Sequence, residues 1–231
     1  MGKHENGYER VPRDGYQTRQ EYVVRSLAEH VAVEGLRLWE FMAGEGFMAR
    51  NLRANGARVF TSDIEPHPGL DAVWDFFASG LPPGLQSFDG MVSNPAWGKR
   101  NKLAEKVIEV GLERISKYGG FLGLLLPTDF DSAVSRLHLF NDPRFLCRIS
   151  LTARPIWFLR TDGEREAPKE NVAWFVWSRR ILRHSGPPLT FHATARPTGF
   201  RVIAAPTGAQ PGSNMKSEQL GLLILRGSEQ A

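Results

Sequence analysis

Residues 36–63 read LRLWEFMAGEGFMARNLRANGARVFTSD, and this stretch decides the fold class. Leu36 to Phe41 is a short apolar run that predicts a buried strand, and it leads directly into Ala43-Gly44-Glu45-Gly46. Met48 to Asn55 follows with the spacing of a helix, and Gly56 is placed to end it. The stretch therefore predicts a strand and a helix that are joined by a glycine turn.

Strands and helices then alternate along the chain. After the glycine turn and its helix, Arg58 to Ser62 predicts a second strand that stops at Asp63, which completes a βαβ unit. The further elements predicted from apolar runs and helical spacing are strands at Phe88–Ser93, Phe121–Leu126, Leu146–Leu151, Ile156–Leu159 and Val172–Trp177, and helices at Tyr22–Val33, Lys102–Ser116 and Ser132–Phe140. This alternation is typical of an α/β protein with a mostly parallel sheet, helices on both faces and right-handed crossovers.

The length and composition favour one large α/β domain. The chain has 231 residues, of which 42% are hydrophobic, and this is enough to build a sizeable core. We expect an N-terminal arm at residues 1–20 and one catalytic domain at residues 21–203. Residues 204–231 are rich in Gly, Pro, Ser, Asn and Gln, and we expect them to form a poorly ordered tail.

The cysteine content and the net charge indicate in which cellular compartment the protein acts and what it can bind. Cys147 is the single cysteine, so neither an intramolecular disulfide nor a thiolate metal cluster is expected, which suits a reducing cytoplasm. The sequence lacks an apolar run of about 18 residues and has a polar N-terminus, so we expect a cytoplasmic protein without a membrane span or signal peptide. The net charge of +4 and the pI of about 9.4 are compatible with a nucleic-acid partner.

The glycine turn and Asp63 predict a nucleotide site. In a doubly wound sheet, ligands bind beyond the carboxyl ends of the strands, where the strand order reverses. Gly44 and Gly46 allow a ligand to approach the backbone, and Asp63 is placed to accept hydrogen bonds from ribose hydroxyls. The pair lacks a third glycine three residues later, although Ala49 fits a looser pattern, so these residues leave NAD and S-adenosylmethionine both open.

Asp75-Phe76 is a further candidate for the nucleotide site. The Asp75 carboxylate is a possible acceptor for an adenine amino group, with Phe76 against the face of the ring. The alternative is an aspartate on an edge strand beside core aromatics. The sequence does not decide between the two.

The tetrapeptide Asn94-Pro95-Ala96-Trp97 follows an apolar strand and predicts the site of the reaction. The Asn94 side-chain oxygen and the Pro95 carbonyl are suited to accept the two hydrogens of an amino group on a planar ring, and Trp97 to stack on that ring. Positioning and electrostatic stabilisation are then sufficient for direct in-line transfer of a sulfonium methyl group to this nitrogen without a metal. The alternative is a strand-terminating Asn-Pro turn beside a buried tryptophan.

Together these residues resemble the DNA adenine-N6 methyltransferases, particularly the short bacterial and phage-type members, over roughly residues 14–180. The resemblance implies a class I methyltransferase (Rossmann-like) fold with S-adenosylmethionine as cofactor. The cofactor-binding residues that it implies are Tyr16, Thr18, Glu40, Ala43, Gly44, Gly46, Asp63, Ile64, Asp75, Phe76 and Asn94. The catalytic residues that it implies are Asn94, Pro95 and Trp97. The chain departs from the family at Arg19 and Ala96, because the family has proline at the first position and usually at the second.

The leading hypothesis is therefore methylation of adenine N6 in DNA. Lys99, Arg100, Lys102 and Arg160 are candidate phosphate contacts, and the alternative is that they form a solvated surface. RNA adenine and a protein glutamine amide remain open as acceptors, as does a catalytically weak or inactive binding module of the same fold. A hydride-transfer enzyme is disfavoured, because nothing resembling its proton donor lies near the second motif.

Overall fold

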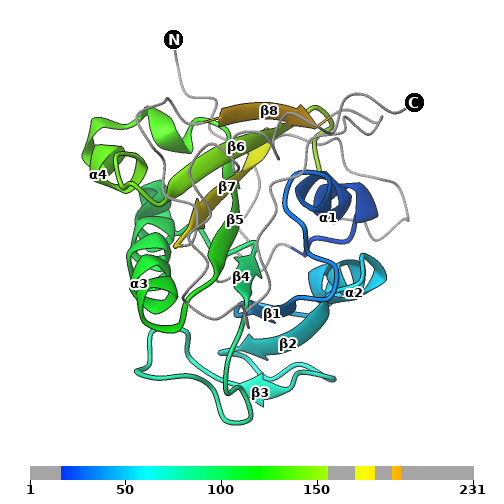
Figure 1. Cartoon of the computed structure of the whole chain (residues 1–231). Coiled ribbons are helices and arrows are strands. Elements are labelled where there is room, and N and C mark those ends of the chain that lie inside the picture. Colours follow the sequence, from blue (N-terminus) through cyan, green and yellow to red (C-terminus); the bar gives the residue numbers. More distant parts are fainter. Residues whose placement is uncertain (1–16, 156–169, 180–188, 194–231) are drawn as a thin grey trace, which may run out of the picture.

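Eight strands form a single sheet in the computed structural model, which describes residues 17–155, 170–179 and 189–193 (Figure 1). The strands are β1 (Arg37–Glu40), β2 (Arg58–Asp63), β3 (Ala72–Val73), β4 (Gly90–Ser93), β5 (Phe121–Pro127), β6 (Phe145–Leu151), β7 (Val172–Ser178) and β8 (Leu189–Ala193). Their order is β3-β2-β1-β4-β5-β7-β6-β8. The neighbouring strands are parallel except for β7, which runs antiparallel to both β5 and β6. The predicted α/β fold class, a mostly parallel sheet with helices on both faces, is confirmed.

The helices cover both faces of this sheet. They are α1 (Glu21–Ala28), α2 (Phe47–Ala54), α3 (Lys102–Tyr118) and α4 (Leu137–Phe140), with the 3-10 turns η2 (Lys99–Asn101), η3 (Phe130–Ser132) and η4 (Val134–Arg136). In Figure 1, α1 and α2 lie on one side of the sheet, and α3 and α4 lie on the other. None of the helices in the described part of the chain is long and apolar enough to span a lipid bilayer.

Two apolar cores result, because successive side chains of a strand point to opposite faces. In β1, Leu38 packs into the core under α1 and α2, whereas Trp39 packs into the core under α3. In β5, Leu125 and Leu126 divide in the same way. Strands that are buried on both faces read as continuous apolar runs, which is why the sequence shows β5 and β7 so clearly.

Two predicted helices differ from the structure. The predicted helix Tyr22–Val33 ends at Ala28, although Val31 and Val33 remain buried in the core and so preserve the apolar spacing. The predicted helix Ser132–Phe140 consists instead of η3, η4 and the short α4, because Ala133 is extended, with φ −98° and ψ 128°. The sequence also did not indicate β3 or β8. The predicted strand Ile156–Leu159 and the predicted tail at 204–231 lie outside the described residues.

The order of the strands determines where a ligand is expected. From β1 the chain steps outward to β2 and β3, whereas β4 and β5 lie on the other side of β1. The strand order therefore reverses between β1 and β4, and ligands bind beyond the carboxyl ends of strands at such a point. Glu40, Asp63 and Ser93 are the last residues of β1, β2 and β4, so the predicted motifs all lie at this edge.

Candidate functional site

The glycine turn after β1 is joined directly to the end of β2. Gly44 has φ 52°, and Gly46, which precedes α2, has φ 72°, so both occupy the left-handed region that favours glycine. The Gly44 N–H donates to Asp63 Oδ2 at 2.8 Å, and the Glu65 N–H donates to Asp63 Oδ1 at 3.0 Å. Asp63 is thus held in place by backbone amides, while each carboxylate oxygen retains capacity for a second donor.

The side chain of Glu40 is a buried carboxylate at the same turn. The residue is 2% exposed, and Oε2 has no hydrogen-bond partner among the described residues. Burial raises the pKa of Glu40 well above its usual value, and the Ala49 N–H and the positive charge of Arg53 oppose this rise only in part. Buried polar atoms in proteins are almost always hydrogen-bonded, so Oε2 marks a position suited to a cationic or hydrogen-donating ligand atom.

Asp63 and Ile64 place an acid beside an exposed apolar side chain. Burial raises the pKa of Asp63, and the Gly44 N–H counteracts this rise. Ile64 directly follows the acid and is 57% exposed, so its aliphatic surface is available for contact beside the carboxylate. A carboxylate that accepts from hydroxyls beside an apolar side chain suits a sugar and its attached base.

Residues 17–20 lie against the glycine turn. Gln17 Oε1 accepts a hydrogen bond from the Glu45 N–H at 3.2 Å, and a Cβ atom on Gly44 would lie 2.4 Å from Gln17 Nε2. Thr18 is buried, and its hydroxyl has no partner in the described part of the chain. Gln17 was not among the predicted site residues; its one sequence signal was its position in the Tyr16-Gln17-Thr18 segment. Tyr16 itself lies outside the described residues.

Arg19, where the resembling family has proline, joins this segment to α2. Its guanidinium lies 3.4 Å from Glu45 Oε2 and stacks 4.0 Å from the centre of the Phe47 ring. The Asn51 side-chain amide donates to the Arg19 carbonyl at 3.4 Å. The ion pair of Arg19 with Glu45 and its stacking on Phe47 therefore hold residues 17–20 in place. In the resembling family, a proline ring restricts the backbone at this position.

The structure places Phe76, which we expected to lie against an adenine ring, among the core aromatics. Phe76 is 2% exposed, and its ring stacks on Phe41 with the centroids 4.1 Å apart, so it belongs to the core. Arg114 from α3 donates to the Phe76 carbonyl at 2.8 Å and keeps this turn packed. Asp75 is exposed, and its Oδ1 accepts the Phe77 N–H at 2.9 Å.

The tetrapeptide Asn94-Pro95-Ala96-Trp97 begins directly after β4, which ends at Ser93. Asn94 is half-buried and Pro95 is buried, and Trp97 contacts both cores while its Nε1 donates to the Leu125 carbonyl at 3.2 Å. The indole is therefore anchored to β5 by one edge. Ser93 was not a predicted site residue, yet its buried hydroxyl has no partner in the described ranges. A serine that closes an apolar strand was its signal in the sequence.

The predicted phosphate contacts differ in their surroundings. Lys99 and Arg100 are exposed, just beyond the tetrapeptide. Lys102 is exposed as well, but it pairs with Glu105 at 2.8 Å. Arg160 lies outside the described residues. Three exposed cations thus follow the tetrapeptide, and one of them, Lys102, is paired with Glu105.

Comparison with known proteins gives structural similarities only. No protein-family model matches the sequence, and no curated protein matches it. The structure is similar to precorrin-6y C5,15-methyltransferase from Geobacter metallireducens, with 14% identity over 77% of this chain and 97% of that chain and a TM-score of 0.46. It is also similar to TrmN from Thermus thermophilus, with 16% identity over 68% of this chain and 48% of that chain and a TM-score of 0.44. It is similar, too, to a TehB-like SAM-dependent methyltransferase from Corynebacterium glutamicum, with 14% identity over 68% of this chain and 86% of that chain and a TM-score of 0.41. The function of this chain is therefore argued from its own residues.

Proposed function

We propose that this chain is an S-adenosylmethionine-dependent N-methyltransferase that methylates adenine N6 in DNA. One observation carries the proposal: the Asn94-Pro95-Ala96-Trp97 tetrapeptide follows β4 at the sheet edge where β1 ends at Glu40 and β2 ends at Asp63. At this edge the Gly44 N–H donates to Asp63. A cofactor site and an amino-acceptor motif thus flank the point where the strand order reverses.

The residues around the glycine turn fit this cofactor. S-adenosylmethionine supplies a methyl group on a positively charged sulfonium, and it also carries an ammonium group and a ribose. Glu40 offers a buried carboxylate oxygen and Thr18 a buried hydroxyl, and neither atom has a hydrogen-bond partner within residues 17–155, 170–179 and 189–193. Asp63 can accept from ribose hydroxyls, and exposed Ile64 can pack against the attached base.

The tetrapeptide after β4 can hold the acceptor amino group. The Asn94 side-chain oxygen and the Pro95 carbonyl accept its two hydrogens, which directs the nitrogen lone pair toward the methyl donor. Trp97 stacks on the base, a contact worth about 1–3 kcal/mol in single-stranded nucleic-acid complexes. Because Leu125 anchors its indole, the ring is oriented before the base arrives.

DNA is the proposed partner because of the charges beside this motif. Lys99 and Arg100 are exposed directly after Trp97, and the whole chain carries a net charge of +4. Cations there can bind the phosphates of a strand whose base has entered the site. The base must leave the duplex first, at a cost of a few kcal/mol.

The proposal is tested by incubating the protein with S-adenosylmethionine and a mixture of DNA, RNA and protein. Mass spectrometry of the nucleosides and of the hydrolysed protein then identifies the product. We expect N6-methyladenine in the DNA fraction. Asn94→Ala is expected to lower turnover on the order of 10²–10³-fold, by analogy with the loss of one electrostatic partner. The control is Asn141→Ala, which alters an exposed asparagine after α4 and is expected to leave turnover unchanged.

Each other outcome rejects a defined part of the proposal. Methyl groups found only in RNA or only in protein overturn DNA as the substrate. Cofactor binding without transfer to any fraction identifies a non-catalytic module of the same fold. Absence of cofactor binding by calorimetry overturns the methyltransferase assignment itself.

A further inference from the structure

We infer that Arg136 is a positioning residue that holds the acceptor loop, defined here as residues 97–101, in the conformation that receives the substrate. The kinetic part of this inference rests on the proposed function. The structural part does not, since it concerns only how the loop is held.

The backbone of the acceptor loop has an unusual conformation. Arg100 has φ 55° and Asn101 has φ 62°, and they are the only non-glycine residues with positive φ in the described ranges. A non-glycine residue whose backbone is left-handed costs the folded state free energy, although asparagine costs less than most residues. Such a conformation persists only where the surrounding structure holds it. Two such residues in succession, directly before α3, therefore require contacts that stabilise them.

Arg136 supplies a contact at this position. Its Nη2 donates to the Arg100 carbonyl at 3.3 Å, its Nη1 donates to the Phe130 carbonyl at 2.8 Å, and its Nε donates to Glu105 Oε1 at 2.8 Å. The guanidinium also lies 4.3 Å from the centre of the Phe130 ring. Arg136 is 8% exposed, so these hydrogen bonds form in a site largely shielded from water.

Glu105 extends this network to the first turn of α3. Its second carboxylate oxygen accepts a hydrogen bond from Lys102 at 2.8 Å. Burial alone would raise the pKa of Glu105, but the hydrogen bonds from Lys102 and Arg136 outweigh it and lower that pKa. The carboxylate is therefore ionised at neutral pH, and it ties Arg136 to the helix that begins where the acceptor loop ends.

The other end of the loop is held independently of Arg136. Trp97 Nε1 donates to the Leu125 carbonyl at 3.2 Å, and the Ala104 N–H donates to the Trp97 carbonyl at 3.2 Å. Within the loop, the Asn101 N–H also donates to the Gly98 carbonyl at 3.2 Å. We therefore expect removal of Arg136 to loosen, without fully releasing, the segment that carries Lys99 and Arg100 while Trp97 stays anchored. Within the described ranges, the hydrogen bonds and the ion pair of Arg136 do not reach the glycine turn, so we expect weaker acceptor binding and unaltered cofactor binding.

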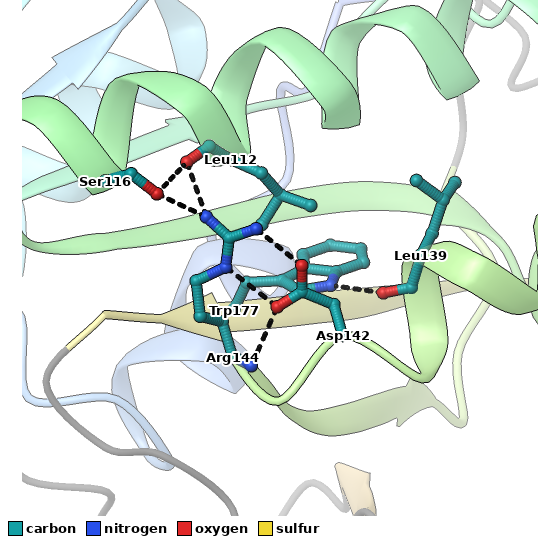
Figure 2. Close-up of polar contacts among 6 residues, drawn as sticks. All are labelled: Leu112, Ser116, Leu139, Asp142, Arg144 and Trp177. Carbon is teal, nitrogen blue, oxygen red and sulfur yellow. Dashed lines mark hydrogen bonds and ion pairs between the residues drawn. The ribbon is translucent and has the colours of Figure 1, made fainter.

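A matched control lies at the other end of α3. Figure 2 shows Arg144 between the Asp142 carboxylate and two groups of α3, the Leu112 carbonyl and the Ser116 hydroxyl. Like Arg136, this arginine pairs with one carboxylate and donates to a backbone carbonyl of another element. In the described part of the chain its hydrogen bonds do not involve the acceptor loop, so Arg144→Met reports the general cost of losing such a network.

The first experiment measures tryptic cleavage after Lys99 and Arg100 under native conditions, with products identified by mass spectrometry. Cleavage of the folded protein follows the population of the open loop. Arg136→Met is expected to raise this rate on the order of tenfold, and Arg144→Met is not. Adding Asn101→Gly to Arg136→Met is expected to restore most of the slow cleavage, because glycine adopts positive φ without strain.

The second experiment separates binding of the two substrates. Arg136→Met is expected to raise KM for DNA on the order of tenfold and to change the Kd for S-adenosylmethionine by less than about twofold. Asn101→Gly should again reverse the change. Should Arg136→Met fold poorly, Glu105→Gln tests the same network with a smaller expected effect.

Three results overturn the inference. One is equal acceleration of loop cleavage by Arg136→Met and Arg144→Met, and another is failure of Asn101→Gly to slow cleavage in the Arg136→Met protein. A rise in cofactor Kd that matches the rise in acceptor KM is the third. The cleavage experiment needs no methyl transfer, so failure of the proposed function is distinguishable from failure of this inference.

Discussion

Replacing Glu40 with glutamine separates the requirements of folding from those of cofactor binding. Glu40 is buried, one of its oxygens has no partner in the part of the chain that the structure describes, and burial raises its pKa well above the usual value of 4.5. The folded protein therefore holds this proton more tightly than the unfolded chain does. As the pH rises above the unfolded pKa, ionisation costs the folded state stability until the folded pKa is passed. Glutamine is free of this cost, because it does not ionise.

The magnitude follows from one proton. Each pH unit between the unfolded and the folded pKa costs the wild type at most about 1.4 kcal/mol. The free energy of unfolding of Glu40→Gln should therefore exceed that of the wild type by an amount that grows with pH and then levels off. For a chain of this length, each kcal/mol corresponds to about 2–4 °C in Tm.

Cofactor affinity is expected to move in the opposite direction. A hydrogen bond to a charged group contributes about 1.5–3 kcal/mol, so losing the carboxylate should weaken S-adenosylmethionine binding at least tenfold. In the wild type the affinity should rise with pH until Glu40 is ionised. Binding below that point should release a proton, because a cationic ligand favours the carboxylate.

Two measurements on the same proteins test this reasoning. Thermal unfolding between pH 5 and pH 9 compares the wild type with Glu40→Gln, and with Glu113→Gln as an exposed control on α3. Calorimetry in buffers of different ionisation enthalpy measures both Kd and proton release. A Glu40→Gln protein that is less stable than the wild type at every pH refutes the account of the buried carboxylate. Unchanged affinity refutes its role toward the cofactor.

Two further substitutions test the remaining assignments. Asp63→Asn relieves the burial of a charge and keeps an acceptor for the Gly44 N–H but loses the acceptor for the Glu65 N–H, so we expect a nearly unchanged Tm at neutral pH but roughly tenfold weaker cofactor binding by calorimetry; full affinity would remove Asp63 from the site. Ala96→Pro restricts the backbone where the resembling family usually has a second proline, and steady-state assays should show equal or higher turnover. A collapse of turnover would instead show that Ala96 is a specific adaptation of this chain.

The positions of the chemistry-bearing residues were predictable because they follow from local pattern and one topological rule. A glycine turn after an apolar strand, an acid after the next strand and Asn94-Pro95 after a third are all legible in the chain. In a mostly parallel sheet, the carboxyl ends of neighbouring strands lie at one edge. The structure places Glu40, Asp63 and Asn94 at that edge, as this rule predicts.

The orientation of side chains was less predictable, because it depends on distant neighbours. Asp75-Phe76 allowed either a ligand contact or an aspartate on an edge strand beside core aromatics, and the structure stacks Phe76 on Phe41 in the core while it leaves Asp75 exposed. The predicted helix Ser132–Phe140 has helical spacing, yet the extended backbone at Ala133 divides it into short turns. Local pattern carries no information about which partner a side chain will meet.

By itself, then, the sequence determined the fold class, the glycine turn and the order of the motifs, because apolar periodicity and turn-forming residues act over a few positions. Only the tertiary structure decided which polar atoms are satisfied. Among the described residues it leaves Glu40 Oε2 without a partner, and it brings Arg136 to Glu105 and to the Arg100 carbonyl, across a separation of 31 and 36 residues. Such pairings form because burial removes water from charged groups, and that depends on the packing of the whole chain.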